Sequence, residues 1–133
     1  MARWMPAIVG AFWLAAMPLQ AHHAISAFYD TSRRVTIEAI VRELHFVNPH
    51  PFVLGDVRSH DGAIEQWRLE MDNQRELVDI GFTYQTLSPG DAIVVAGSPA
   101  RREARSLYVR RMDRPSDGFW YEQVGSSPRM RSR

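Results

Sequence analysis

Three histidines have the residue type and the positions expected of a metal site. His22 and His23 are adjacent near the start of the chain, and His50 lies between two prolines. Imidazole nitrogen suits copper, and copper(II) heads the affinity order of the divalent first-row metals. If the mature chain begins at His22, its amine, the first peptide nitrogen and the His23 ring can surround copper(II) in a square-planar arrangement. Alternatively, the amine and the His22 ring can combine with a distant histidine to form a brace. We therefore take His22, His23 and His50 as candidate copper ligands.

Three further side chains are candidates for the same site. His45 precedes the loop of His50 and could face the same cleft, and Tyr29 or Asp30 could supply an axial oxygen. Simpler interpretations stay open for all of these residues. The two leading histidines can be only a polar mature start, the Asn-Pro-His segment only a turn, and Tyr29 and Asp30 only an anchor for the preceding arm.

The absence of certain residues and motifs narrows the chemistry. The chain has 133 residues and no cysteine, which excludes disulfides, thiolate zinc sites, iron-sulfur clusters and cysteine nucleophiles. A metal here must bind nitrogen or oxygen. No phosphate-binding glycine loop, serine elbow or His-Glu-x-x-His motif is present, and acidic residues such as Glu70 are interpreted as surface charge. We therefore propose no catalytic residue from the sequence.

The first 21 residues have the order of a secretory signal peptide. Arg3 precedes an 11-residue apolar run from Ala7 to Met17, and small residues end at Ala21. A spanning helix needs roughly 18 or more apolar residues, so a permanent membrane anchor is the weaker alternative. We expect cleavage after Ala21 and a periplasmic or secreted protein without a stable membrane span.

Charge is distributed unevenly along the chain. Residues 22–100 carry 6 arginines against 11 acidic residues, whereas residues 101–133 carry 9 against 4. A basic patch is expected where Arg101, Arg102 and Arg105 lie near Arg110 and Arg111, and it could attract an anionic ligand or acidic lipid headgroups. Export argues against nucleic acid as a partner. An envelope protein could contact the same patch.

Hydrophobic patterning predicts the elements that position these residues. Alternation from Val35 to Val41 predicts a strand, and a change of phase before Leu44 predicts a bulge near Arg42 or Glu43. Phe52 to Arg58 and Gln66 to Met71 predict two more strands, joined by a hairpin that contains the exposed His60. Trp67 is expected to point into the core.

The second half of the chain is predicted to contain a short helix and two more strands. Asn73 is predicted to cap a short helix, with Glu76 three residues later and Gly81 at its end. A turn at residues 88–91 precedes strands at residues 92–98 and 107–112. Three strands, a helix and two strands are typical of the OB-fold, a mostly β five-stranded Greek-key barrel. A β-sandwich is the alternative.

These elements divide the chain into a signal peptide at residues 1–21, an arm at 22–33, the barrel at 34–121 and a disordered tail at 122–133. Near the end of the barrel, Asp117 to Tyr121 are expected to form an aromatic plug or a short sixth strand. The last eight residues contain only one apolar side chain, Met130, which is the reason to expect disorder there.

The sequence resembles an uncharacterised family of small exported bacterial proteins, a domain of unknown function. The resemblance covers about residues 22–113. It rests on His22, His23, Phe28, Tyr29, Asp30, Asn48, Pro49, His50, Trp67, Glu70, Gly81, Phe82, Thr83, Leu87, Pro89, Gly90 and Asp91. Family members commonly have serine after the two histidines and glycine within the first strand, where this chain has Ala24 and Ala39. The resemblance implies export and a single β domain, and it implies no activity.

Three hypotheses about function follow from the sequence. The first is a non-enzymatic exported module that binds a small ligand, in particular copper, through His22, His23 and His50. The second is a copper redox enzyme that uses the same histidines. The third is an envelope interaction domain that binds a protein partner without a metal.

Overall fold

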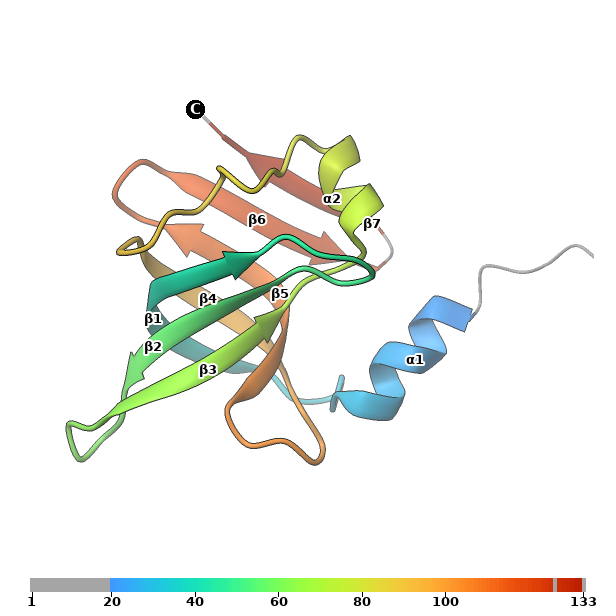
Figure 1. The fold of residues 1–133 in the computed structure, drawn as a ribbon. Coiled ribbons are helices and arrows are strands. Elements are labelled where there is room, and N and C mark those ends of the chain that lie inside the picture. Colours follow the sequence, from blue (N-terminus) through green and yellow to red (C-terminus); the bar gives the residue numbers. More distant parts are fainter. Residues whose placement is uncertain (1–19, 126, 133) are drawn as a thin grey trace, which may run out of the picture.

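A computed structural model describes residues 20–125 and 127–132, and in this part of the chain seven strands form one continuous sheet (Figure 1). Two helices accompany it, α1 (Gln20–Phe28) and α2 (Gln74–Asp79). The strands are β1 (Val35–His45), β2 (Phe52–Arg58), β3 (Ile64–Glu70), β4 (Ala92–Pro99), β5 (Ser106–Arg114), β6 (Phe119–Val124) and β7 (Ser127–Arg131).

Five of these strands close into a barrel. The sheet order is β3-β2-β1-β4-β5-β6-β7, and an additional parallel pairing of β3 with β5 joins the ends of the five-stranded part. Strands β6 and β7 extend the sheet beyond the barrel, and α2 lies between β3 and β4 in sequence. The predicted mostly β barrel with one short helix after its third strand is therefore confirmed.

A bulge in β1 lets this strand serve two neighbours. Its first half, from Val35 to Ile40, pairs with β4, and its second half, from Ile40 to His45, pairs with β2. The register with β2 shifts between Val41 and Glu43, where the change of hydrophobic phase predicts it. The bulge bends the strand, as an extra unpaired residue does. A single bent strand can therefore pair with both β4 and β2 in the closed barrel.

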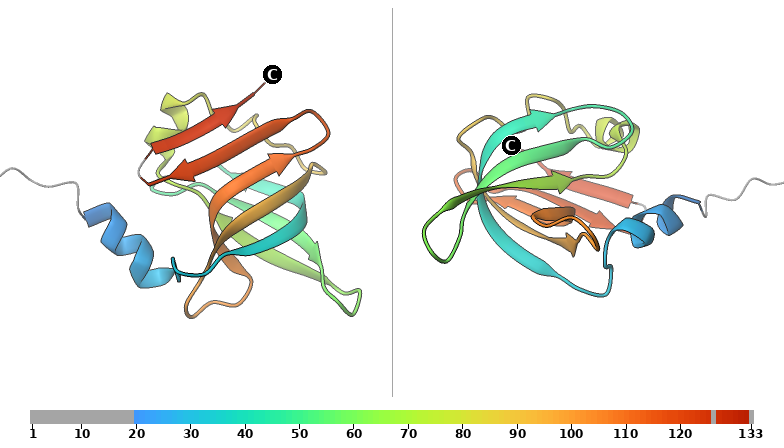
Figure 2. Two further views of the ribbon diagram at one scale, coloured as in Figure 1. Left: turned by 180° about the vertical axis from the view of Figure 1, so that it is seen from behind. Right: turned by 60° about the horizontal axis from the view of Figure 1, so that its bottom comes forward.

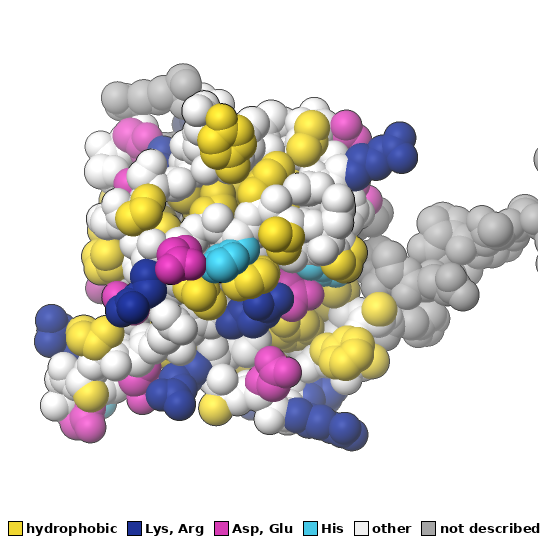
Figure 3. Space-filling view, in the orientation of Figure 1, with side chains coloured by type: hydrophobic (Ala, Val, Ile, Leu, Met, Phe, Trp, Pro, Cys, Tyr) yellow, Lys and Arg dark blue, Asp and Glu magenta, His cyan; other side chains and the backbone are white. Residues whose placement is uncertain are grey.

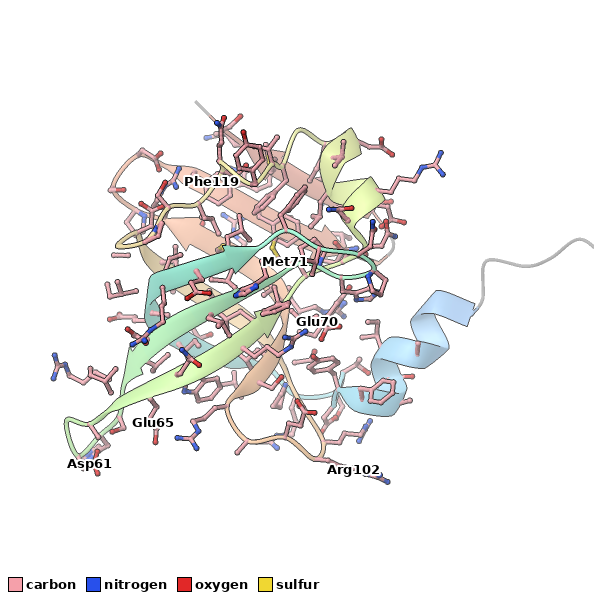
Figure 4. The ribbon with its side chains drawn as sticks, in the orientation of Figure 1. Asp61, Glu65, Glu70, Met71, Arg102 and Phe119 are labelled. Carbon is pink, nitrogen blue, oxygen red and sulfur yellow. The ribbon has the colours of Figure 1, made fainter. Side chains whose placement is uncertain are left out.

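The barrel interior is filled by side chains that alternate along the strands. Leu69, Val95 and Val109 are fully buried, and Leu77 of α2 and Phe82 beyond it close one end. Met71 and Phe119, labelled in Figure 4, are also buried, the latter on β6. Complete burial of each such side chain contributes about 1.5 to 3 kcal/mol to stability. Trp67, expected to point into the core, is half-buried and packs against its edge.

The caps and turns around α2 follow their sequence signals. Asn73 Oδ1 accepts a hydrogen bond from the backbone N–H of Glu76 at 2.9 Å, so Asn73 is the N-cap. Gly81 follows the helix with φ of 90°, and Gly90 has φ of 94° in the turn before β4. Both glycines occupy the left-handed region that side chains disfavour.

The C-terminal segment differs from the expected disordered tail. β6 runs to Val124 and pairs with β7, which reaches Arg131. Inward-facing apolar side chains on both strands explain the hairpin. Tyr121 of β6 is fully buried, and Met130 of β7 packs against the core. On the other face Arg129 lies 3.4 Å from Glu122, an exposed ion pair that contributes at most about 1 kcal/mol.

The N-terminal segment lies largely outside the described residues. The predicted signal peptide at residues 1–21 is described only from residue 20, where α1 begins. Neither described helix has the length and apolarity that crossing a membrane requires. α1 projects from the barrel at the end where the β1–β2 loop lies (Figure 2).

Substitution of Gly97 tests the close approach of β4 to β5. A Cβ at Gly97 would lie 2.4 Å from the backbone oxygen of Tyr108, which cannot move without breaking the sheet. We expect Gly97→Ala to lower the free energy of unfolding by about 3 kcal/mol in urea denaturation, the cost of overpacking. In the matched control Gly55→Ala, the added Cβ would lie 3.1 and 3.5 Å from the side chains of Ala39 and Leu69 and 3.8 Å from the backbone oxygen of Ile40, so the cost should be about 1 kcal/mol. Equal losses in the two variants would contradict this account.

Candidate functional site

The carboxylate of Glu70 joins the N-terminal arm to the loop that carries His50. Tyr29 donates its hydroxyl proton to Glu70 Oε2 at 2.7 Å, and His50 Nδ1 lies 3.1 Å from Glu70 Oε1. The histidine contact has the distance of an ion pair without the alignment of a full hydrogen bond. Glu70 stands at the end of β3, near the middle of the face seen in Figure 4. Two segments distant in sequence therefore meet at one side chain.

Backbone hydrogen bonds hold the β1–β2 loop at this position. Pro51 and Pro49 offer their carbonyl oxygens to the N–H groups of Met71 and Gln74, at 2.8 and 2.9 Å. The side chain of Gln74 donates to the carbonyl of Phe46 at 2.9 Å. The loop is thus attached to the segment that links β3 to α2, and the Asn48–Pro49 peptide bond within it is cis. His50 is presented from a fixed backbone.

The arm is attached to the β4–β5 loop. Tyr29 forms an isolated bridge with Ala100, and the N–H of Asp30 donates to the carbonyl of Pro99 at 2.8 Å. Arg101 donates to the carbonyl oxygens of Phe28 and Ser26, which anchors the C-terminal end of α1. Tyr29 is only 5% exposed, so the arm packs on the barrel through this side chain, whereas the neighbouring Phe28 is 70% exposed.

The charges around Glu70 stabilise an ion pair. Burial acts to raise the pKa of Glu70, but the contacts with His50 and Tyr29 outweigh it and hold the pKa below its ordinary value. Glu70 in turn raises the pKa of His50 against the opposing effect of burial, and Asp72 and Glu76 act in the same direction. Burial and the bond to Glu70 raise the pKa of the Tyr29 hydroxyl, which remains a donor. Tyr29 therefore positions Glu70 and is not poised to bind a cation as phenolate.

The orientation of His50 matters for metal chemistry. Because Nδ1 faces a carboxylate, Nε2 is the ring nitrogen left to meet an external ligand. Histidines that bind metals usually direct their other ring nitrogen toward a carboxylate or a carbonyl, which fixes the ring and raises its basicity. His50 has this orientation toward Glu70, at ion-pair distance and without a full hydrogen bond. Acidic, basic and histidine side chains gather across the middle of the face formed by β1, β2 and β3 (Figure 3).

The other predicted ligands are placed differently. His45 stacks on Phe52 with ring centroids 4.4 Å apart, and its Nε2 lies 2.8 Å from Glu43. Asp30 accepts hydrogen bonds from the N–H and hydroxyl of Ser32, so it stabilises the turn after the arm. His22 and His23 belong to α1, but their side chains lie outside the described residues. Among the side chains that the structure describes, no group of three or more His, Asp or Glu is arranged to hold a metal.

Glu70 is one of the residues that carry the family resemblance, but the sequence indicated no role for it in the site. Its alternation with Leu69 and Met71 places it on the outer face, which is where surface charge is expected. The register between β2 and β3 sets Glu70 opposite Phe52, two residues after His50. A strand pairing, which sequence spacing alone does not specify, creates the contact.

A protein-family model matches residues 11–108. The chain belongs to DUF6152, a family of unknown function. The match includes the arm, the loop of His50 and all of the strands from β1 to β4, so the Glu70 site lies within the part shared with DUF6152. Searches of curated proteins and of solved structures gave no match.

Titration of His50 tests its pairing with Glu70. In metal-free protein, NMR should give His50 a pKa above the ordinary value of 6.5, because Glu70 favours the imidazolium. The stability from this pair is fully present below pH 6.5 and is lost as pH rises through the folded-state pKa. Glu70→Gln should lower the pKa of His50, whereas Glu65→Gln on the same strand should not. An unchanged pKa in Glu70→Gln would show that the contact is electrostatically unimportant.

Proposed function

We propose that this protein is an exported binding module that captures copper(II) between its N-terminal arm and the loop of His50. The observation that carries the proposal is the shared contact of Tyr29 and His50 with the Glu70 carboxylate. It brings the arm next to a histidine whose second ring nitrogen is available. Export and copper binding are parts of this proposal, and no catalytic residue is part of it.

The length of the arm fits a joint site. His22 precedes Tyr29 by seven residues, which span about 10 Å as helix and about 23 Å when extended. Tyr29 is tied to the same carboxylate as His50, so an amino terminus at His22 would lie within reach of the His50 ring. α1 also leaves the barrel at the end that carries the β1–β2 loop, which is consistent with that path (Figures 1 and 2).

The donor set favours copper over other divalent metals. Signal cleavage after Ala21 would supply an amine and two imidazoles, and His50 would add a third imidazole from the barrel. Nitrogen donors without thiolate suit copper(II), which binds such sites more tightly than nickel or zinc. Glu70 would act through His50 by orienting its ring, a role that typically changes metal affinity about 10- to 100-fold.

A competitive copper(II) titration of the processed protein tests the proposal. Intact mass and N-terminal analysis first establish that the chain begins at His22. We expect His23→Ala and His50→Ala each to weaken copper binding at least about tenfold, and Glu70→Gln to weaken it about tenfold. The matched control is His60→Ala, because His60 is exposed on the β2–β3 hairpin, away from this site.

Two results would overturn the proposal. If a synthetic peptide of residues 22–28 binds copper(II) as tightly as the protein, the barrel contributes nothing and His50 is not a ligand. A processed terminus other than His22 would remove the amine on which the site depends. Weaker binding in all histidine variants, His60→Ala included, would indicate non-specific capture.

A further inference from the structure

A groove on the outer face of β2, β1 and β4 has no part in the function proposed above. Its volume is about 580 Å³, which falls within the range of small-molecule sites, about 300 to 1,000 Å³. The residues that shape it include Glu38, Ile40, Ile64, Ala92, Val94 and Pro115. None of the candidate copper ligands lines this groove.

Strand register shows that the side chains from β1 and β4 share one surface. Glu38 and Ile40 flank a buried residue of β1, and Ala92 and Val94 flank a buried residue of β4, so all four side chains face outward. Glu38 pairs with Val94, and Ile40 pairs with Ala92. Side chains at paired positions lie about 4.5 to 5.5 Å apart at Cβ. One ligand can therefore contact all four.

The groove opens where β1 and β2 separate. Their pairing ends at Ile40 and Asp56, whereas β2 continues to Arg58 in its pairing with β3. The β2–β3 hairpin projects from the barrel at this point (Figure 1). Ile64 pairs with Arg58 across the hairpin and lines one side of the groove.

The opposite side is held in place by Arg114. Its guanidinium donates to Asp91 Oδ2 at 2.6 Å and to the carbonyl of Thr86 at 2.8 Å, and it pairs with Asp117 at 2.8 Å. These contacts attach the turn after β5 to the loop before β4. Pro115, the next residue, is therefore a fixed wall, and a fixed wall needs little ordering when a ligand binds.

The surface of the groove is apolar where the outer face of a strand is normally polar. Ile40 is 46% exposed and Ile64 is 55% exposed, and Ala92 and Pro115 are also exposed. A hydrocarbon chain lying on these side chains would remove apolar surface from water, which is favourable.

The charged side chains of the groove differ in what they contact. Asp56 accepts two hydrogen bonds from Arg42, at 3.0 and 3.1 Å. Arg58 donates to the carbonyl of Gly62 at 3.2 Å, toward the hairpin turn. Glu38 is exposed, and its carboxylate has no hydrogen bond or ion pair within the described part of the chain. A carboxylate beside an apolar surface suits a cation that carries a hydrocarbon chain.

We propose that this groove binds a small primary alkylammonium ion. The Glu38 carboxylate accepts the N–H groups of the ammonium, and the hydrocarbon chain lies against Ile40, Ala92 and Val94. The site is separate from the copper site and does not depend on it. Ile40 precedes His45 by five residues of β1, which corresponds to about 17 Å along the strand.

Hexylammonium is a suitable probe, with hexanol and hexanoate as its uncharged and oppositely charged equivalents. In ¹H–¹⁵N NMR spectra of the metal-free protein at constant pH and ionic strength, hexylammonium should shift the amide signals of Ile40 and Val94 saturably. Glu38→Gln should weaken its binding about fivefold, the upper range for an exposed ion pair, and should leave hexanol binding unchanged. The matched control is Glu65→Gln, because Glu65 follows Ile64 on the other face of β3, outside the groove (Figure 4).

A second variant tests the apolar surface. Ile40→Thr keeps a β-branched side chain at a half-exposed position, so the strand should be retained. It should weaken hexylammonium and hexanol binding by similar factors, about fivefold, because both lose the same apolar contact.

Several outcomes would overturn the proposal. Equal affinities for hexylammonium and hexanol would show that the charge is not recognised, and tighter binding of hexanoate would assign the groove to an anion at Arg58. Equal losses in Glu38→Gln and Glu65→Gln would indicate general attraction of a cation to acidic residues. The spectra of each variant also report folding, so an unfolded Ile40→Thr protein would leave Glu38→Gln to decide.

Discussion

Closure of the barrel through the parallel pairing of β3 and β5 is the constraint on which the contact between the arm and Glu70 depends. The pairing sets Glu70 opposite Tyr108 and Arg68 opposite Ser106. Tyr29 packs against Tyr108, with ring centroids 5.7 Å apart, and so reaches Glu70. The β4–β5 loop also joins β3 through its backbone, because the carbonyl of Arg105 accepts a hydrogen bond from the N–H of Arg68 at 2.9 Å. An open sheet with the same strands would not bring Tyr29 to Glu70.

The strands, the bulge and α2 were predicted well because neighbouring residues in the sequence determine each of them. The phase change after Val41 specified the bulge, and Asn73 specified the start of α2. The bounds of β2 follow from two prolines before it and an Asp-Gly turn after it. These features depend on backbone conformations that single residues favour or forbid.

The candidate site was only partly predictable, since its contacts depend on register. His50 stood out because two prolines flank it, but its partner Glu70 is 20 residues away and resembles any outward-facing charge on a strand. The β6–β7 hairpin was missed for a related reason. The burial of Met130 depends on β6 being present as a template, and composition alone does not reveal a neighbouring strand.

The hydrogen bond from the Tyr29 hydroxyl to Glu70 also limits how far the preceding segment can move from the barrel. If the mature chain begins at His22, as proposed, its terminus would lie seven residues from this bond and could explore only a small volume around the loop of His50. Because residues 22–28 belong to α1, this connection is a helix, which would hold the terminus about 10 Å from Tyr29 along its axis. Groups too weak to associate as separate molecules would then meet readily, and the tyrosine would set the radius within which they do so.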